Sequence, residues 1–219
     1  MKALRNGWWW MLDYGYAGYW QFRAAVDRRR PEAYRSGAGR PIVVIPGIWE
    51  TWQFMRPLVE KMHDAGHPVY VLAALGRNSR PIVESAAAVV DVIRHYDLRD
   101  VLLVTHSKGG LIGKYAMATL DIDQRIASMV AVSAPFAGSR YAPYLPLQSL
   151  RAFSPLDATT VLLGENLSVN SRITSIYGQF DPHIPEGSEL AGARNIGLPT
   201  GGHFRILSRP EIADAVLQM

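Results

Sequence analysis

The chain has 219 residues, which suits one domain with one hydrophobic core. Apolar residues make up 48% of it and charged residues 19%, values typical of a globular protein and not of a disordered one. There is no cysteine, which excludes disulfides, a cysteine nucleophile and thiolate metal sites. The net charge is +4, but the basic residues are scattered apart from Arg28–Arg30, so we expect no nucleic-acid partner.

The first residues are rich in tryptophan, tyrosine and arginine. Lys2 and Arg5 precede an aromatic run that Asp13 interrupts after Leu12. The run is shorter than the roughly 20 apolar residues of a spanning helix. It also lacks the apolar core of about 7–15 residues and the cleavage site of a secretory signal. We therefore expect a cytoplasmic protein without a signal peptide.

Two hypotheses are open for this N-terminal arm. In the first, it is a helix that packs an aromatic face on the domain's own core. In the second, it is an interfacial anchor, with tryptophans at the lipid boundary and arginines behind them, and the protein makes peripheral membrane contact. We expect the first. Residues 31–40, PEAYRSGAGR, are expected to be a linker, and the oligomeric state is not predicted.

From residue 41 onward, strand-like and helix-like segments alternate. Thr51 is expected to cap the first helix, although Pro57 fits that helix only if it begins later. Strands buried on both faces and separated by helices imply a mainly parallel sheet with right-handed crossovers. The expected strands are 41–47, 68–74, 101–106, 127–135, 172–180 and 193–198, and the expected helices are 51–66, 82–97, 108–120 and one from 210.

Three chemistry-bearing residues lie where predicted strands end. Ser107 follows the third strand, Asp181 the fifth and His203 the sixth. Ligands of an open α/β sheet bind beyond the carboxyl ends of its strands, so we expect these side chains to meet. Their chain order, Ser–Asp–His, is that of the α/β-hydrolases and differs from the orders in chymotrypsin and subtilisin.

From about residue 41 to its end, the chain resembles an α/β-hydrolase of the bacterial lipase/esterase type. The motifs occur in family order: IVVIPGIW, VTHSKGGL at the nucleophile elbow, VSAPFAGSRYA, FDPHIP in the acid loop and GGHF in the histidine loop. The resemblance implies a minimal α/β-hydrolase fold, with a mostly parallel six-stranded sheet, helices on both faces and a small cap insertion at 136–172. The arm and linker would occupy 1–40 and the hydrolase domain 41–219.

The elbow departs from the pattern G-x-S-x-G because Thr105 replaces the first glycine. Strand and helix pack closely there, so this residue must be small. Threonine is short but β-branched, and Gly109 and Gly110 remain to let the helix approach. Serine also caps helices well, so a capping role for Ser107 is the alternative. The strand-end aspartate and histidine favour the nucleophile.

The resemblance assigns a role to each member of the expected triad. Ser107 would be the nucleophile, and His203 the general base that removes its proton. Asp181 would orient the ring and stabilise the imidazolium. Asp157 and Glu186 are the substitutes if Asp181 proves dispensable. No cofactor is expected.

The oxyanion would be bound by two backbone N–H groups. Lys108, the residue after the nucleophile, supplies one, and its side chain is expected to reach solvent. The loop after the first strand supplies the other, from Ile48 or, as second choice, Trp49.

The remaining histidines are weaker candidates. His106 adjoins the elbow serine and is expected to support the turn, whereas His183 lies close to the predicted acid and is the rival base. His63 and His67 are four residues apart, a spacing known from metal sites. No third ligand is evident, so no metal is expected.

The expected substrate-binding residues are Trp49, Phe136 and Tyr141, with Trp52 as a further wall. This apolar lining favours an ester with an apolar acyl chain, a small-molecule or lipid-like substrate. We therefore expect a serine hydrolase that cleaves carboxylic esters. Two alternatives stay open: an acyltransferase that uses the same triad, and a hydrolase-fold protein that binds a ligand or partner without turnover.

Overall fold

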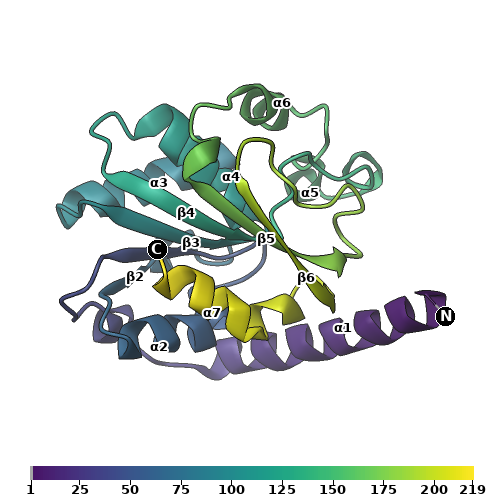
Figure 1. The fold of residues 1–219 in the computed structure, drawn as a ribbon, viewed down its shortest axis with the longest axis horizontal. Helices are drawn as coiled ribbons and strands as arrows, with labels where there is room; N and C mark the ends of the chain where they lie inside the picture. Colours follow the sequence, from purple (N-terminus) through teal and green to yellow (C-terminus); the bar gives the residue numbers. More distant parts are fainter. Residues whose placement is uncertain (1) are drawn as a thin grey trace.

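The computed structural model describes residues 2–219 and is built on one six-stranded sheet (Figure 1). Every strand pair is parallel, and the strand order is β2-β1-β3-β4-β5-β6. The predicted six-stranded sheet is therefore confirmed, with parallel pairing throughout. The strands are β1 (Ile42–Ile45), β2 (Val69–Val71), β3 (Val101–His106), β4 (Ile126–Val132), β5 (Ile173–Phe180) and β6 (Arg194–Gly201).

Helices cover both faces of this sheet, as predicted. On one face lie α3 (Ile82–His95), α4 (Lys108–Tyr115) and α6 (Ala158–Glu165). On the other lie α1 (Lys2–Val26), α2 (Arg56–Asp64) and α7 (Pro210–Leu217). The central strands β1 and β3 are buried at every position, because apolar side chains from each helical layer pack against them.

One local prediction was wrong. Thr51 makes no side-chain capping bond, because a short 3₁₀ turn (Trp52–Met55) follows it and α2 begins at Arg56. That later start leaves Pro57 in the first helical turn, where its missing N–H is not needed. The segment expected to be a linker begins with a short 3₁₀ helix (Pro31–Tyr34), and Tyr34 is buried against Trp52.

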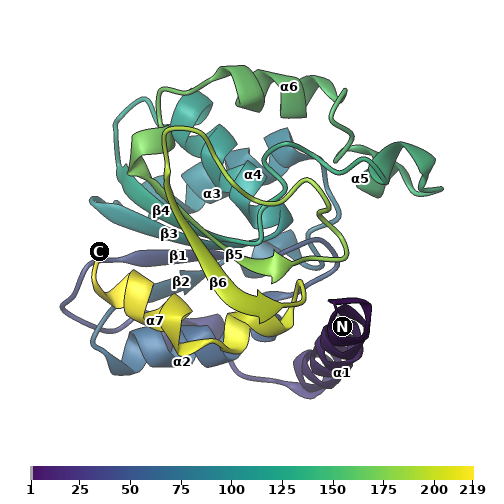
Figure 2. The same cartoon turned by 45° about the vertical axis from the view of Figure 1, so that its right-hand side comes forward.

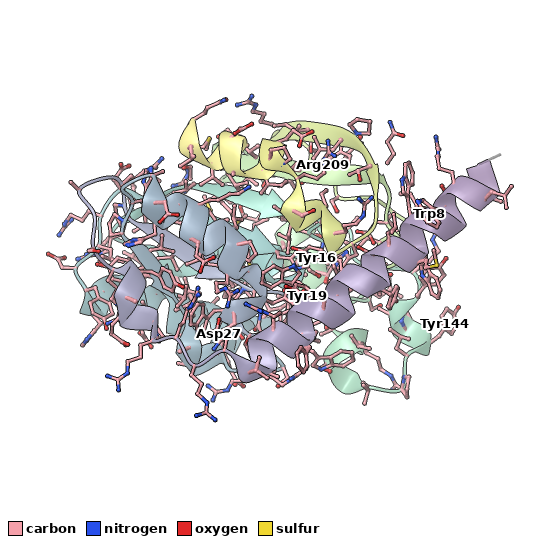
Figure 3. All side chains as sticks on the ribbon, turned by 90° about the horizontal axis from the view of Figure 1, so that it is seen from below. Trp8, Tyr16, Tyr19, Asp27, Tyr144 and Arg209 are labelled. Atoms are coloured by element: carbon pink, nitrogen blue, oxygen red, sulfur yellow. The ribbon has the colours of Figure 1, made fainter. Side chains whose placement is uncertain are left out.

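The N-terminal arm is one continuous helix, α1, which crosses the lower side of the molecule (Figure 3). Its inner face packs on the domain: Trp9 lies on Gly201, and Tyr16 and Trp20 join the core beneath the sheet. The first hypothesis for the arm thus describes one face of α1. The cap between β4 and β5 contains α5 (Gln148–Arg151) and α6, and both α5 and α1 flank the carboxyl edge of the sheet (Figure 2).

Candidate active site

Ser107, His203 and Asp181 form one hydrogen-bonded chain at the carboxyl edge of the sheet. The Ser107 Oγ lies 2.9 Å from Nε2 of His203, and Nδ1 of that ring lies 2.7 Å from Oδ2 of Asp181. The other carboxylate oxygen of Asp181 accepts backbone N–H groups of His183 (2.8 Å) and Ile184 (3.2 Å). These bonds fix the carboxylate, which then directs the Nδ1 proton and leaves Nε2 to face the serine.

Ser107 occupies a strained elbow between β3 and α4. Its φ of 51° and ψ of −119° are uncommon for a residue with a side chain, and such strain persists where the surroundings enforce it. The side chain makes no capping bond to α4, so the N-cap alternative fails. The elbow instead points the hydroxyl out of the backbone and toward His203.

Three glycines of α4 let the helix lie close to the sheet, and two of them, Gly110 and Gly113, lie against the branched side chain of Thr105. A Cβ on Gly109 would lie 2.3 Å from the Ile45 carbonyl oxygen, and one on Gly110 would lie 2.4 Å from the Cβ of Ala134. Gly113, one turn further on, would bring a Cβ to 3.4 Å from Cγ2 of Thr105. The helix therefore approaches β3 closely even though the usual strand glycine is missing.

The charges around His203 favour its protonated form. Burial of the ring opposes a positive charge, but the carboxylate beside Nδ1 outweighs burial and raises the pKa of His203 above its ordinary value. Glu50 and Asp13 act in the same direction. Burial also opposes the ionised form of Asp181, but the partner ring and the backbone N–H groups lower the pKa of that carboxyl.

His183, the rival base, lies beside the triad and not in it. Its ring centroid is 4.9 Å from that of His203, and its Nε2 lies 3.1 Å from the hydroxyl of Tyr14 on α1. Burial, reinforced by the neighbouring histidine, lowers the pKa of His183 to about 4. The ring is therefore neutral at pH 7 and serves as a wall of the site.

Asp13 of α1 is a site residue that the sequence did not reveal. It is fully buried and accepts backbone N–H groups of His203 (2.9 Å), Phe204 (2.8 Å) and Arg205 (2.7 Å). A Cβ on Gly202, whose φ is +110°, would lie 2.4 Å from the Asp13 carboxylate, so glycine is needed for this approach. The feature of the sequence that could have pointed to this role is that Asp13 is a single acidic residue in an aromatic segment.

A second unforeseen link joins the oxyanion loop to the histidine loop. Glu50, also buried, accepts the Gly47 N–H at 2.7 Å and lies 2.9 Å from Nδ1 of His106. Nε2 of His106 lies 3.0 Å from the carbonyl oxygen of His203, so Nε2 must carry a proton. His106 therefore braces both loops, in keeping with the supporting role expected for it.

The expected oxyanion donors border the serine. Ile48 lines the cavity above it, and Lys108 is the first residue of α4, where N–H groups have no intrahelical partner. The prediction for the Lys108 side chain was wrong: it is 2% exposed, and its Nζ donates to the carbonyls of Asn78 (2.7 Å) and Arg80. Burial lowers the pKa of Lys108 to about 8.

A cavity of about 480 Å³ opens onto Ser107 and His203. Trp49 and Tyr141 line it, as expected. Phe136 does not: it is buried in the core, with Nζ of Lys114 5.9 Å from its ring centroid. Trp52, also buried, lies in the core beneath the other sheet face. The cap and acid-loop members of the lining are Ser139, Tyr141, Ala142, Leu145, Leu150, Phe153, Pro182, His183 and Ile184.

The substitute carboxylates have other partners. Asp157 caps α6 by accepting the Thr159 N–H at 2.9 Å, and Glu186 pairs with Arg140 at 2.5 Å. Within residues 2–219, no cluster of three potential metal ligands occurs. His67 instead lies 2.9 Å from the Arg40 carbonyl.

Solved structures with this fold include several bacterial proteins of low sequence identity. A lipase of Bacillus licheniformis shares 14% identity, with 88% of this chain and 94% of that one covered and a TM-score of 0.64. The ydeN product of B. subtilis shares 19% (82% and 98% covered, TM-score 0.62). A bromoperoxidase of Bacillus anthracis shares 15% (84% and 92% covered, TM-score 0.61). These likenesses establish the fold alone.

Among curated proteins, none matches the sequence. The family model described as alpha/beta hydrolase family matches residues 42–195, most of the chain. That range includes β1, the elbow with Ser107 and the acid loop with Asp181. The chain therefore belongs to the alpha/beta hydrolase family.

Proposed function

We propose that this protein is a serine hydrolase that cleaves carboxylic esters through an acyl-enzyme. The observation that carries the proposal is the unbroken hydrogen-bond chain from Ser107 through His203 to Asp181 at the base of an open, apolar cavity. With its Nδ1 proton directed to Asp181, a neutral His203 presents a free lone pair to the serine hydroxyl.

The reaction would proceed in two halves. Ser107 Oγ attacks the ester carbonyl while His203 Nε2 takes its proton, and the backbone N–H groups of Lys108 and Ile48 bind the oxyanion. His203 then returns the proton to the leaving alcohol, and the acyl group stays on the serine. A water molecule repeats the sequence on the acyl-enzyme and releases the acid.

A fluorophosphonate probe tests this proposal directly. The probe phosphonylates an activated serine, so intact-mass analysis should show one adduct on the wild type and none on Ser107→Ala. Ser154→Ala, a change in the cap, should label like the wild type. If a folded wild type gives no adduct, the proposal is wrong and the result favours the alternative of a hydrolase-fold protein that binds without turnover. Titration of free acid from a turned-over ester separates hydrolysis from acyl transfer to another acceptor.

The cavity favours an apolar acyl chain. Its lining is chiefly aliphatic and aromatic, and Leu145, Leu150 and Phe153 of the cap line it together with Ser107. Burying each additional CH₂ contributes about 0.8 kcal/mol until the cavity is full. The substrate class we propose is therefore an uncharged ester of a medium-length acyl chain, a small-molecule or lipid-like ester.

A chain-length series of p-nitrophenyl esters checks this prediction. Esters of about four to ten carbons should exceed acetate in kcat/KM by about tenfold. Tyr141→Ala should change the profile, because this tyrosine lines the cavity. Tyr144→Ala is the matched control, since Tyr144 belongs to the same cap turn but is 87% exposed outside the cavity. A profile that is flat from acetate upward would rule out an apolar acyl site.

A further inference from the structure

The side of α1 that faces away from the domain is unusually apolar. We call it the outer face of α1 and define it by its large exposed side chains: Leu4, Trp8, Met11, Tyr19, Phe22 and Val26. Each of them is more than half exposed, and Leu4 reaches 82%. Figure 3 shows α1 from this side, with Trp8 and Tyr19 along it. Single exposed apolar residues are ordinary, but six along one helix mark an interaction surface.

The charged residues on and near α1 indicate what kind of surface it could bind. The sole acidic residue between Lys2 and Val26 is Asp13, and it is buried under the histidine loop. Arg5 and Arg23 are exposed, and Arg28 and Arg30 are exposed just beyond the helix. An exposed apolar stripe that includes a tryptophan and is accompanied by exposed arginines is the pattern of a helix that lies in the surface of an anionic bilayer.

Such a helix would lie on the membrane surface and would not cross it. Across residues 2–219, no helix combines the length and the apolar character of a transmembrane span. The inner face of α1 is also occupied by the domain, because it carries Asp13 and packs against β6. The two faces of the helix thus have different partners.

The outer face also adjoins the mouth of the active site. Tyr14, on the edge of this face, contacts His183 at 3.1 Å, and Gln21 donates to the Trp49 carbonyl at 3.2 Å. His183 and Trp49 both line the cavity. A bilayer that covered the outer face would therefore lie close to the residues that line the cavity.

We propose that the outer face of α1 binds the surface of an anionic phospholipid bilayer. This docking places the cavity mouth at the membrane. The docking itself does not depend on the proposed hydrolase activity. Delivery of a membrane-borne ester to Ser107 does depend on it.

Vesicle flotation without substrate tests the docking. The full chain should float with phosphatidylcholine vesicles that contain phosphatidylglycerol, and about tenfold less with phosphatidylcholine alone. High salt should weaken the binding, because the arginine contribution is screened. Brominated phosphatidylglycerol should quench the tryptophan emission, since Trp8 and Trp10 are half exposed on α1.

Two triple variants make a matched pair. Leu4→Gln/Met11→Gln/Phe22→Gln removes three side chains of the outer face and should lower vesicle binding by about tenfold or more. Ile122→Gln/Leu167→Gln/Leu217→Gln removes three exposed apolar side chains outside α1 and should bind like the wild type. Thermal melts establish that both variants are folded. If the first variant is unfolded, quenching of the wild-type tryptophan emission by brominated lipid tests whether α1 contacts the bilayer.

Three results would overturn the proposal. The first is a wild type that does not float with anionic vesicles. The second is equal binding by both triple variants. The third is a wild-type dimer that the outer-face variant converts to a monomer without any flotation, because a second copy would then be the occupant. Fluorophosphonate labelling is measured without vesicles, so failure of either proposal is recognised separately.

Discussion

Ser107→Ala and His203→Ala should each lower ester turnover by about 10⁴–10⁶-fold. The two changes remove the nucleophile and its base from one hydrogen-bond chain, with 2.9 Å between Ser107 Oγ and His203 Nε2, so losing either disables both. Asp181→Ala should cost less, because the base remains and only its orientation and charge partner are lost. Steady-state turnover with a short p-nitrophenyl ester, with a melt for each variant, gives the comparison.

His183→Ala is the informative control for the base. His183 also lies in the site, but its depressed pKa of about 4 and its bond to Tyr14 place it outside proton transfer. We expect a loss far smaller than that of His203→Ala. Equal losses would show that the base has been misassigned. Full activity of Asp181→Ala would show that another carboxylate orients the ring.

The sheet could be predicted because its signals are local. The run at 101–106 begins with four apolar residues and is buried at every position, and the predicted strand coincides with β3. The expected strands at 172–180 and 193–198 fall on β5 and β6, with boundaries that differ by a few residues. The predicted ends of helices and strands are wrong where packing overrides the local pattern. At Thr51, for example, a 3₁₀ turn intervenes and α2 begins later.

The triad side chains could be placed at one sheet edge for a similar reason. Parallel strands all end on the same edge, so a residue just after a strand is located by the strand alone. The direction of a side chain within a packed layer is not local. Phe136 follows β4 closely but enters the core, and Lys108 follows the serine but turns inward to two loop carbonyls.

The role of Asp13 could not be predicted from the sequence, for a different reason. It lies 190 residues before His203, and no pattern along the chain connects an N-terminal helix to the loop after β6. Its sequence signal, one acid in an aromatic segment, indicates only that this segment is neither a spanning helix nor a signal peptide. The structure turns the same residue into a support for the candidate base.

Asp13→Asn should lower kcat/KM by about 10²-fold, because a small displacement of a catalytic group is enough for such a loss. The Asp13 Oδ1 accepts the N–H groups of Phe204 and Arg205, and Oδ2 accepts that of His203. Asparagine keeps one oxygen but sets an amide N–H against the remaining donor. The backbone of His203 would therefore lose its acceptor while the rest of the loop keeps its own.

The pH profile separates this positioning role from a purely structural one. The Asp13 carboxylate helps to raise the pKa of His203, and the base works only when neutral. Removing the negative charge should therefore move the acid limb of kcat/KM to lower pH. Asp157→Asn is the matched control, because Asp157 also holds backbone N–H groups, at 2.9 and 3.3 Å, but caps α6 outside the triad. That variant should leave both the rate and the limb in place. If Asp13→Asn lowers the melting temperature and the rate with an unmoved acid limb, Asp13 supports the fold and does not tune the base.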